Sequence, residues 1–353
     1  MSNKSVKEFL NKKGVEISLK KYGIDVLGSM ALGLFATLLV GTILNTIGTK
    51  LGITYLTETI WPAARDMTGA AIGVAIAHSL NAPALVIYSA VVVGYIGNLS
   101  GGPVGALIAT CVSVELGKIV SKETKLDIIV TPATTIIVGS LIATVLGPVL
   151  SSGMTSIGQF VIKATELKPF FMGIVVSVVV GMVLTLPISS AALCMMIGLS
   201  GLAGGAATAG CSAQMVGFAV ASFRENKWGG LFAQGIGTSM LQMGNIVKNP
   251  RIWLPATLAS AITGPIATCL FHLQMNGAAV SSGMGTCGLV GQIGVYTGWI
   301  ADIEAGSKAA ITPMDWIGLI FVSFLLPGVL SWLFSVLFRK IGWIKEGDMR
   351  LDL

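Results

Sequence analysis

The chain has 353 residues, of which 54% are hydrophobic and only 11% are charged, and its mean hydropathy is +0.84. A soluble domain carries about 25% charged residues, so this composition excludes a soluble protein and indicates an all-α polytopic membrane protein embedded in a lipid bilayer. The net charge of +6 does not indicate nucleic-acid binding, because the lysines gather at the ends of apolar runs.

A basic arm, residues 1–21, precedes the first apolar run and carries six lysines against two glutamates. Val6, Phe9 and Leu10 share one face of a helix by their spacing. We therefore expect a short amphipathic arm on the cytoplasmic membrane surface. The next apolar run has full spanning length, so we expect it to be retained rather than cleaved. A topology anchor and a regulatory role are both open for the arm.

The apolar runs predict about 10 membrane segments, since a spanning helix needs about 20 apolar residues. The candidate spans are 24–48, 84–98 with its flanks, 101–119, 128–150, 169–190, 228–247, 252–273 and 316–338. Shorter Gly- and Ala-rich runs, which predict broken or re-entrant helices, lie at 67–81, 191–203, 204–221 and 277–296. A bilayer tolerates such interruptions only where protein buries them.

The distribution of basic residues predicts the orientation of the chain. The arm is basic, and so is the C-terminal end, with Arg339, Lys340, Lys345 and Arg350, so we expect both termini to be cytoplasmic. The segment 299–315 carries three acidic residues against one lysine, which suits the outer side. An even number of crossings satisfies these expectations.

Four short segments recur in the same order along the chain. The pairs are 69–78 with 205–214, 114–120 with 241–247, 132–134 with 255–257, and 151–154 with 281–284. We predict two homologous membrane halves, 22–160 and 165–296, followed over 297–353 by an outer loop, a last transmembrane helix and a cytoplasmic tail. Interrupted helices in internal repeats are typical of secondary transporters, whose solute site lies where the repeats meet. Parallel and inverted repeats are both open.

Ionisable side chains at membrane depth are costly and are therefore candidates for function. Glu115 lies in an apolar run and its repeat partner is Gln242, whereas His78 ends the first small-residue run and its partner is Gln214. We expect these four residues to bind a small polar solute, because carboxylates and amides bond hydroxyl groups and imidazole takes a proton near neutral pH. Two alternatives remain open. Glu115 can pair with Lys118 at the membrane edge, and His78 can be a satisfied core histidine.

Further polar residues lie beside glycine-rich breaks, where free backbone groups can hold a ligand. These additional solute-binding candidates are Asn98, Gln234, Asn245, Asn276, Ser281 and Ser282. Close helix packing is the competing explanation of the glycines.

Motifs for catalysis, metals and cofactors are missing from the sequence. It has no phosphate loop, no HExxH, no nucleophile elbow and no dinucleotide fingerprint in context, so we expect no catalytic site and no cofactor. The cysteines form no CxxC pair, which predicts buried free thiols rather than disulfides or a metal site. They are Cys111, Cys194, Cys211, Cys269 and Cys287.

Three segments of the second half carry a resemblance to a known family. They are GGAATAGCSAQM at 204–215, QMGNIVKNPRI at 242–252 and NGAAVSSGMGTCGLVGQIG at 276–294. In these segments the sequence resembles the EIIC-like membrane proteins of the bacterial phosphotransferase system, in the branch that includes perfringolysin O regulator-type proteins. The resemblance covers nearly the whole chain.

The resemblance implies a permease of the bacterial cell membrane that carries a small polar solute, such as a sugar. Separate IIA and IIB proteins would supply the phosphoryl group, since this sequence shows no IIA or IIB motif, and the resemblance also implies a homodimer. The regulator-type branch supplies the alternative, a transporter-derived membrane sensor or regulator of gene expression that acts through the basic arm.

Overall fold

The computed structural model describes residues 9–15, 18 and 21–351. The secondary structure of this part is helical, with one isolated bridge between Gly201 and Met275, so the all-α prediction is confirmed. The chain divides into two compact units, Met1–Gly153 and Met154–Leu353. The predicted halves, 22–160 and 165–296, remain a prediction.

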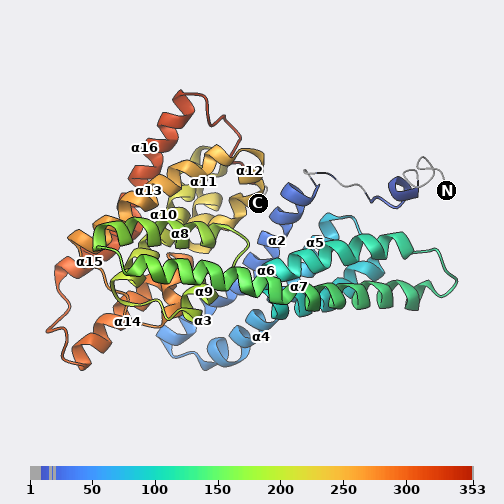
Figure 1. Ribbon diagram of the computed structural model, residues 1–353, viewed down its shortest axis with the longest axis horizontal. Helices are drawn as coiled ribbons and strands as arrows, with labels where there is room; N and C mark the ends of the chain where they lie inside the picture. Colours follow the sequence, from blue (N-terminus) through green and yellow to red (C-terminus); the bar gives the residue numbers. More distant parts are fainter. Residues whose placement is uncertain (1–8, 16–17, 19–20, 352–353) are drawn as a thin grey trace. The chain divides into compact units, whose positions relative to one another are not determined.

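The first unit consists of helices joined by short connections (Figure 1). In chain order they are η1 (Lys21–Asp25), α2 (Val26–Leu34), η2 (Phe35–Leu39), α3 (Val40–Leu51), η3 (Tyr55–Ile60), α4 (Trp61–Asp66), α5 (Thr68–Ser79), α6 (Ala84–Val120) and the start of α7 (Asp127–Thr165). The element η2 is a π-helical stretch that follows α2 and leads into α3 without a turn. The chain therefore follows one helical path through the first candidate span.

The first small-residue run packs α5 closely against α6. A Cβ atom on Gly73 would lie 2.2 Å from the carbonyl oxygen of Ala90, so only glycine allows this approach. Small residues let helix backbones come this close within a membrane. Close packing, the competing explanation of the glycines, therefore holds at this position.

The element α6 contains two helical segments, which correspond to the two runs that the sequence predicts at 84–98 and 101–119. It bends at Gly101 and Gly102, and the φ of +63° at Gly102 is one that side chains with a Cβ rarely adopt. Pro103 follows and has no backbone N–H to donate, which weakens the helical ladder at the same point. The break predicted by the glycines is thus present and reverses the chain. A Cβ atom on Gly97 would lie 2.7 Å from the Cα atom of Ala106, so the two helical segments of α6 pack against each other.

The second unit continues from α7 and is built around one central helix (Figure 1). Its elements are α8 (Pro169–Thr185), α9 (Ser190–Met196), α10 (Gly201–Ala221), α11 (Phe223–Phe232), η4 (Ala233–Gly237), η5 (Ser239–Gln242), α12 (Met243–Lys248), η6 (Pro250–Trp253), α13 (Leu254–Pro265), η7 (Ile266–Leu270), η8 (Ala279–Gly283), η9 (Cys287–Leu289), α14 (Val290–Glu304), α15 (Pro313–Ile320), η10 (Phe321–Leu325) and α16 (Leu326–Lys340).

Helix α10 is the centre of this unit, packed by α8, α13 and α16. Nearly all of its residues are buried, which its Gly- and Ala-rich sequence permits. A Cβ atom on Gly205 would lie 1.8 Å from the carbonyl oxygen of Leu273, so the irregular chain after η7 also approaches α10 backbone to backbone. The run at 204–221 therefore forms one continuous helix, not the broken helix that its composition predicts.

Two apolar clusters form the core at the two ends of α10. The first includes Ala209, Leu273, Trp299 and Val322. The second includes Phe218 and also Met349, which belongs to the C-terminal segment, residues 341–351. The C-terminal segment is thus part of the core of the second unit.

Five helices in the described residues are long and apolar enough to cross a membrane. They are Val26–Thr49, Ala84–Val120, Asp127–Thr165, Pro250–Leu270 and Pro313–Lys340. The expected span at 228–247 is wrong, because α11, η4, η5 and α12 divide it into short pieces. The predicted re-entrant segment at 277–296 corresponds to the turns η8 and η9 followed by α14. The number of membrane segments remains a prediction.

The N-terminal arm is described only in part. Val6, one residue of its predicted apolar face, lies outside the described residues. Residues 9–12 are helical, and the amine of Lys13 pairs with Glu123 and donates a hydrogen bond to the carbonyl of Ser121. The described end of the arm therefore lies against the C-terminal end of α6.

Candidate functional site

Glu115 in α6 lies at the centre of a charged cluster in the first unit. Its side chain is 12% exposed, and its Oε1 accepts a hydrogen bond of 2.7 Å from the hydroxyl of Tyr22. The amine of Lys118 lies 3.0 Å from Oε2, and that of Lys21 lies 3.4 Å from Oε1. Two ammonium groups and one hydroxyl therefore compensate a largely buried carboxylate.

The ion pair between Glu115 and Lys118, which was one of two alternatives for Glu115, is present, but it is buried rather than solvated. The side chain of Lys118 is only 2% exposed, and its amine also donates to the carbonyl oxygens of Leu80 and Gly14. Removing one partner of such a buried pair costs far more than loss of an exposed pair, because the remaining charge stays desolvated. Burial, and then the hydrogen bond to Glu115, raises the pKa of Tyr22, so its hydroxyl remains a donor at neutral pH.

The other two candidates of the first unit lie apart from this hydrogen-bonded cluster. His78 occupies the last turn of α5 and its side chain is exposed, so it is not a buried core histidine. Asn98 is partly buried just before the break in α6, and its Cβ faces Gly69 of α5. Neither side chain belongs to a hydrogen bond found among the described residues.

Gln214 is fully buried in α10 and has protein partners for both ends of its amide. Its Oε1 accepts from the indole Nε1 of Trp253 at 2.9 Å and from Thr185 at 3.3 Å. Its Nε2 donates to Thr257 and Ser260. The amide thereby ties α8, α10 and α13 together, which is the behaviour of a structural core amide.

Three of the predicted amides meet in one hydrogen-bonded chain. Gln242 donates to Oε1 of Gln234 at 2.9 Å, and Asn245 donates to Oε1 of Gln242 at 2.9 Å. Gln234 and Gln242 are fully buried and Asn245 is nearly so. The sequence motif at 242–245 therefore does gather polar groups at one place in the second unit.

The C-terminal segment occupies these amides. Gln242 donates to the carbonyl of Met349 at 2.9 Å, and Asn245 donates to the carbonyl of Arg350 at 2.8 Å. The side-chain amides of Asn226 and Asn249 donate three further hydrogen bonds to this segment. The acceptors are the carbonyls of Met349 and Trp343 and the carboxylate of Asp348. A solute could reach Gln242 in this arrangement only after the segment has left.

Sequence reasoning missed Asn226, Asn249 and the whole C-terminal segment as members of this cluster. Asn249 stands beside the selected motif, in the run Lys248-Asn249-Pro250, where an asparagine before proline predicts a turn. Nothing local in the sequence pairs these amides with a segment about 100 residues further along the chain.

The two serines of η8 also have a structural setting. Ser282 is fully buried and its hydroxyl donates to the carbonyl of Leu199 at 2.7 Å. Ser281 is buried, with its Cβ against Gly294 of α14. Ser190 donates in turn to the carbonyl of Gly283, so these hydroxyls satisfy carbonyl groups that the irregular backbone leaves without helical partners.

Asn276 differs from the other candidates because it lines a cavity, of about 520 Å³, in the second unit. Its Nδ2 donates to both carboxylate oxygens of Asp302, at 3.1 and 2.9 Å, and to Oε1 of Gln274 at 3.1 Å. The lining residues are Phe271, His272, Leu273, Gln274, Asn276, Trp299, Asp302, Ser307, Lys308 and Asp315. A concave site with convergent amide, carboxylate, ammonium and aromatic groups is suited to a small polar ligand.

The charged groups on the cavity wall are one ammonium group and two carboxylates, so carboxylates are in excess. The amine of Lys308 lies 2.9 Å from Asp315, and Asp302 carries the second carboxylate. His272 adopts a φ of +45°, which is uncommon for a residue with a side chain and strains the backbone at the cavity. Of the lining residues, sequence reasoning had selected Asn276 alone for binding, because it assigned the acidic segment 299–315 only to topology.

The described residues contain no group of three or more histidine, cysteine or carboxylate side chains that could hold a metal ion. All five cysteines are free. Cys194, Cys211 and Cys287 are buried as expected, but Cys269 is exposed and Cys111 only partly buried, because each lies on a helix near the surface of its unit.

Comparison with known proteins gives one match. A family model described as "Phosphotransferase system, EIIC" matches residues 24–351. No curated protein and no solved structure matches the chain.

Proposed function

Since the chain belongs to the EIIC family of the phosphotransferase system, over residues 24–351, we propose that it is a membrane permease component that binds and translocates a small polar solute. A sugar is the first candidate, and separate IIA and IIB proteins would supply the phosphoryl group. The protein would work in the bacterial cell membrane as a homodimer.

The observation that carries this proposal is the cavity bounded by Gln274, Asn276 and Asp302. Hydroxyl groups of a sugar can replace the internal hydrogen bonds between Asn276 and Asp302, since an amide and a carboxylate both bond hydroxyls. The volume of about 520 Å³ is within the ordinary range for small-molecule sites.

The remaining predicted residues are proposed to contact the solute at other points along its path. His78, Asn98 and Glu115 are the candidates of the first unit, with two polar side chains that lack protein partners and one buried carboxylate. Gln214, with the trio Gln234, Gln242 and Asn245, has protein partners throughout, so a direct role for these amides requires a second state of the second unit.

The test is a thermal-shift screen of the purified full-length protein in detergent against sugars, sugar alcohols and small carboxylates. A ligand that binds only the folded state raises the melting temperature. Asp302→Asn should abolish the shift, because it removes the carboxylate that meets Asn276. Glu304→Gln is the matched control, since Glu304 is exposed on the same helix and does not line the cavity.

Two results would contradict the proposal at different levels. A ligand that raises the melting temperature of both variants would agree with the permease function but would show that this cavity is not the binding site. Glu115→Gln would then test the first unit. The absence of any shift across the panel would favour the regulatory alternative.

That alternative has its own observation. The carbonyl of Gly14 in the arm accepts a hydrogen bond from Lys118, and Lys118 pairs with Glu115. A change in the charge or position of Glu115 would therefore alter the contact between Lys118 and the arm, as a membrane sensor requires. Deleting residues 1–20 should then abolish the effect of the protein on gene expression while leaving ligand binding intact. Loss of ligand binding with the effect on expression unchanged would count against the regulatory alternative.

A further inference from the structure

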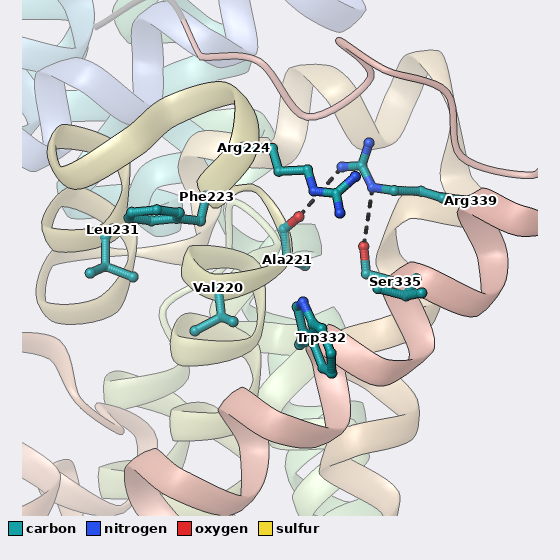
Figure 2. Close-up of a pocket in the computed structure, with 9 residues that line it drawn as sticks. Val220, Ala221, Phe223, Arg224, Leu231, Trp332, Ser335 and Arg339 are labelled. Carbon is teal, nitrogen blue, oxygen red and sulfur yellow. Dashed lines mark hydrogen bonds between the residues drawn. The ribbon is translucent and has the colours of Figure 1, made fainter.

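A second cavity, of about 300 Å³, lies in the second unit between the C-terminal end of α10, α11 and α16 (Figure 2). Its wall joins apolar side chains to two arginines and one serine. Six of its lining residues are Val220, Arg224, Leu231, Trp332, Ser335 and Arg339. No step of the proposed solute path uses this cavity.

The guanidinium groups of Arg224 and Arg339 converge at one end of this cavity (Figure 2). Arg339 is fixed there: its Nη2 lies 2.7 Å from Glu225 and donates to the carbonyl of Ala221, and its Nε donates to the hydroxyl of Ser335. Arg224 is exposed, and its guanidinium has no ion pair or hydrogen bond within the described part of the chain. Glu225 balances only one of the two arginines, so this end of the cavity keeps a positive charge that favours an anion.

The position of the cavity along α16 matches the edge of a membrane. Arg339 and Lys340 are the last residues of the candidate span Pro313–Lys340. Trp332 is 51% exposed about two turns earlier in α16, and Trp228 on α11 is 64% exposed. Exposed tryptophans with basic residues at the end of a span are typical of the headgroup level of a bilayer.

We propose that this cavity binds an acidic phospholipid, with its headgroup phosphate between Arg224 and Arg339 and an acyl chain along Val220, Leu231 and Trp332. The forked N–H groups of arginine match phosphate oxygens, and the apolar wall continues in the direction of the span. Basic pockets between transmembrane helices are suited to acidic headgroups. A free phosphate ion would leave the apolar wall uncovered.

The proposal is tested by thermal unfolding of the purified full-length protein in detergent, titrated with phosphatidylglycerol, phosphatidylcholine or inorganic phosphate. Phosphatidylglycerol should raise the melting temperature more than the other two. Arg224→Gln should weaken the apparent affinity for phosphatidylglycerol about tenfold, since it removes one charge-assisted contact. Arg224→Gln should still melt like the wild type without lipid, because no internal bond is lost.

Lys340→Gln is the control, because it removes one exposed positive charge next to Arg339 but outside the cavity. It should keep the wild-type affinity for phosphatidylglycerol. Equal affinity in Arg224→Gln and the wild type would overturn the site, and equal loss in both variants would reduce it to general surface charge. An equal response to inorganic phosphate, or to phosphatidylcholine, would overturn the assignment to an acidic lipid.

Discussion

Buried amides show at the scale of single residues how polar groups are used in this chain. Polar groups away from water are costly unless they are hydrogen-bonded, and the amide of Gln214 satisfies this condition at both ends. Gln234 and Gln242 satisfy it through each other and through the C-terminal backbone. Asn276 is the exception, because its partners lie on the wall of a cavity.

Gln214→Leu should lower the free energy of unfolding by about 1–3 kcal/mol, because the indole N–H of Trp253 loses its acceptor while the volume of the side chain hardly changes. The measurement is thermal or denaturant unfolding of the purified protein in detergent. Gln159→Leu on α7 is the matched control and should change stability by less than about 0.5 kcal/mol, since Gln159 is exposed. Equal unfolding of the two variants would contradict the structural role.

At the scale of elements, small residues set the distances between backbones. Gly73 in α5 and Gly205 in α10 belong to the two segments that resemble each other in the sequence, and each lies against a backbone carbonyl of its own unit. The repeated run is therefore explained in both places by close packing within a unit. A shared solute site between the halves is an additional hypothesis that this packing does not require.

Gly205→Ala should destabilise the second unit by about 3 kcal/mol, because its new Cβ would lie 1.8 Å from the carbonyl oxygen of Leu273 and the backbone would have to shift. Gly229→Ala in α11 is the matched control, since no atom lies within 4 Å of the Cβ it would add. This control should be neutral or slightly stabilising, as alanine is the better helix former. Melting temperatures and the yield of monodisperse protein distinguish the two, and a stable Gly205→Ala protein would disprove the close approach.

The elements also show how far the sequence alone could lead. Apolar length correctly predicted the helices at 24–48, 128–150 and 316–338, because each needs only a continuous run. It failed at 228–247, where the extended backbone of Thr238 separates η4 from η5 and divides the chain into short pieces. The glycines at 101 and 102 correctly predicted the break that divides α6 into two helical segments.

The candidate site was less predictable than the helices, for a physical reason. Asn276 was selected from its glycine-rich setting, but Asp302 and Gln274 become its partners only through the fold of η7 to α14. Matched segments can also differ in local structure. Residues 151–154 lie within α7, whereas Ser281 and Ser282, in the matching segment, belong to the 3₁₀ turn η8. Tertiary packing, not the tetrapeptide, decides its conformation.

At the scale of the whole molecule, the number of crossings determines on which side of the membrane each terminus lies. Five candidate spans alone would place the termini on opposite sides, whereas the basic residues at both ends predict one side. Helix α8, with 17 residues, is roughly 26 Å long, close to the hydrocarbon thickness of about 30 Å. The element α6 reverses at Gly101 and Gly102, so its 37 residues form two packed segments of roughly 26 Å each, and the second segment gives room for a second crossing.

We therefore expect an even number of crossings, with one further segment, either the second segment of α6 or α8, added to the five. A fluorescent protein fused after Leu353 should then fluoresce, because it folds in the cytoplasm, and alkaline phosphatase inserted at Gly306 should be active, because it needs the outer side. Gly306 is exposed in the turn between α14 and α15, with a φ of +73° and no atom within 4 Å of an added Cβ, so it tolerates an insertion. Alkaline phosphatase that is fused after Leu353 in place of the fluorescent protein, and is active there, would show that the last span ends outside. That result would contradict the orientation predicted from Arg339 and Lys340, and it would place the proposed lipid cavity in the outer leaflet.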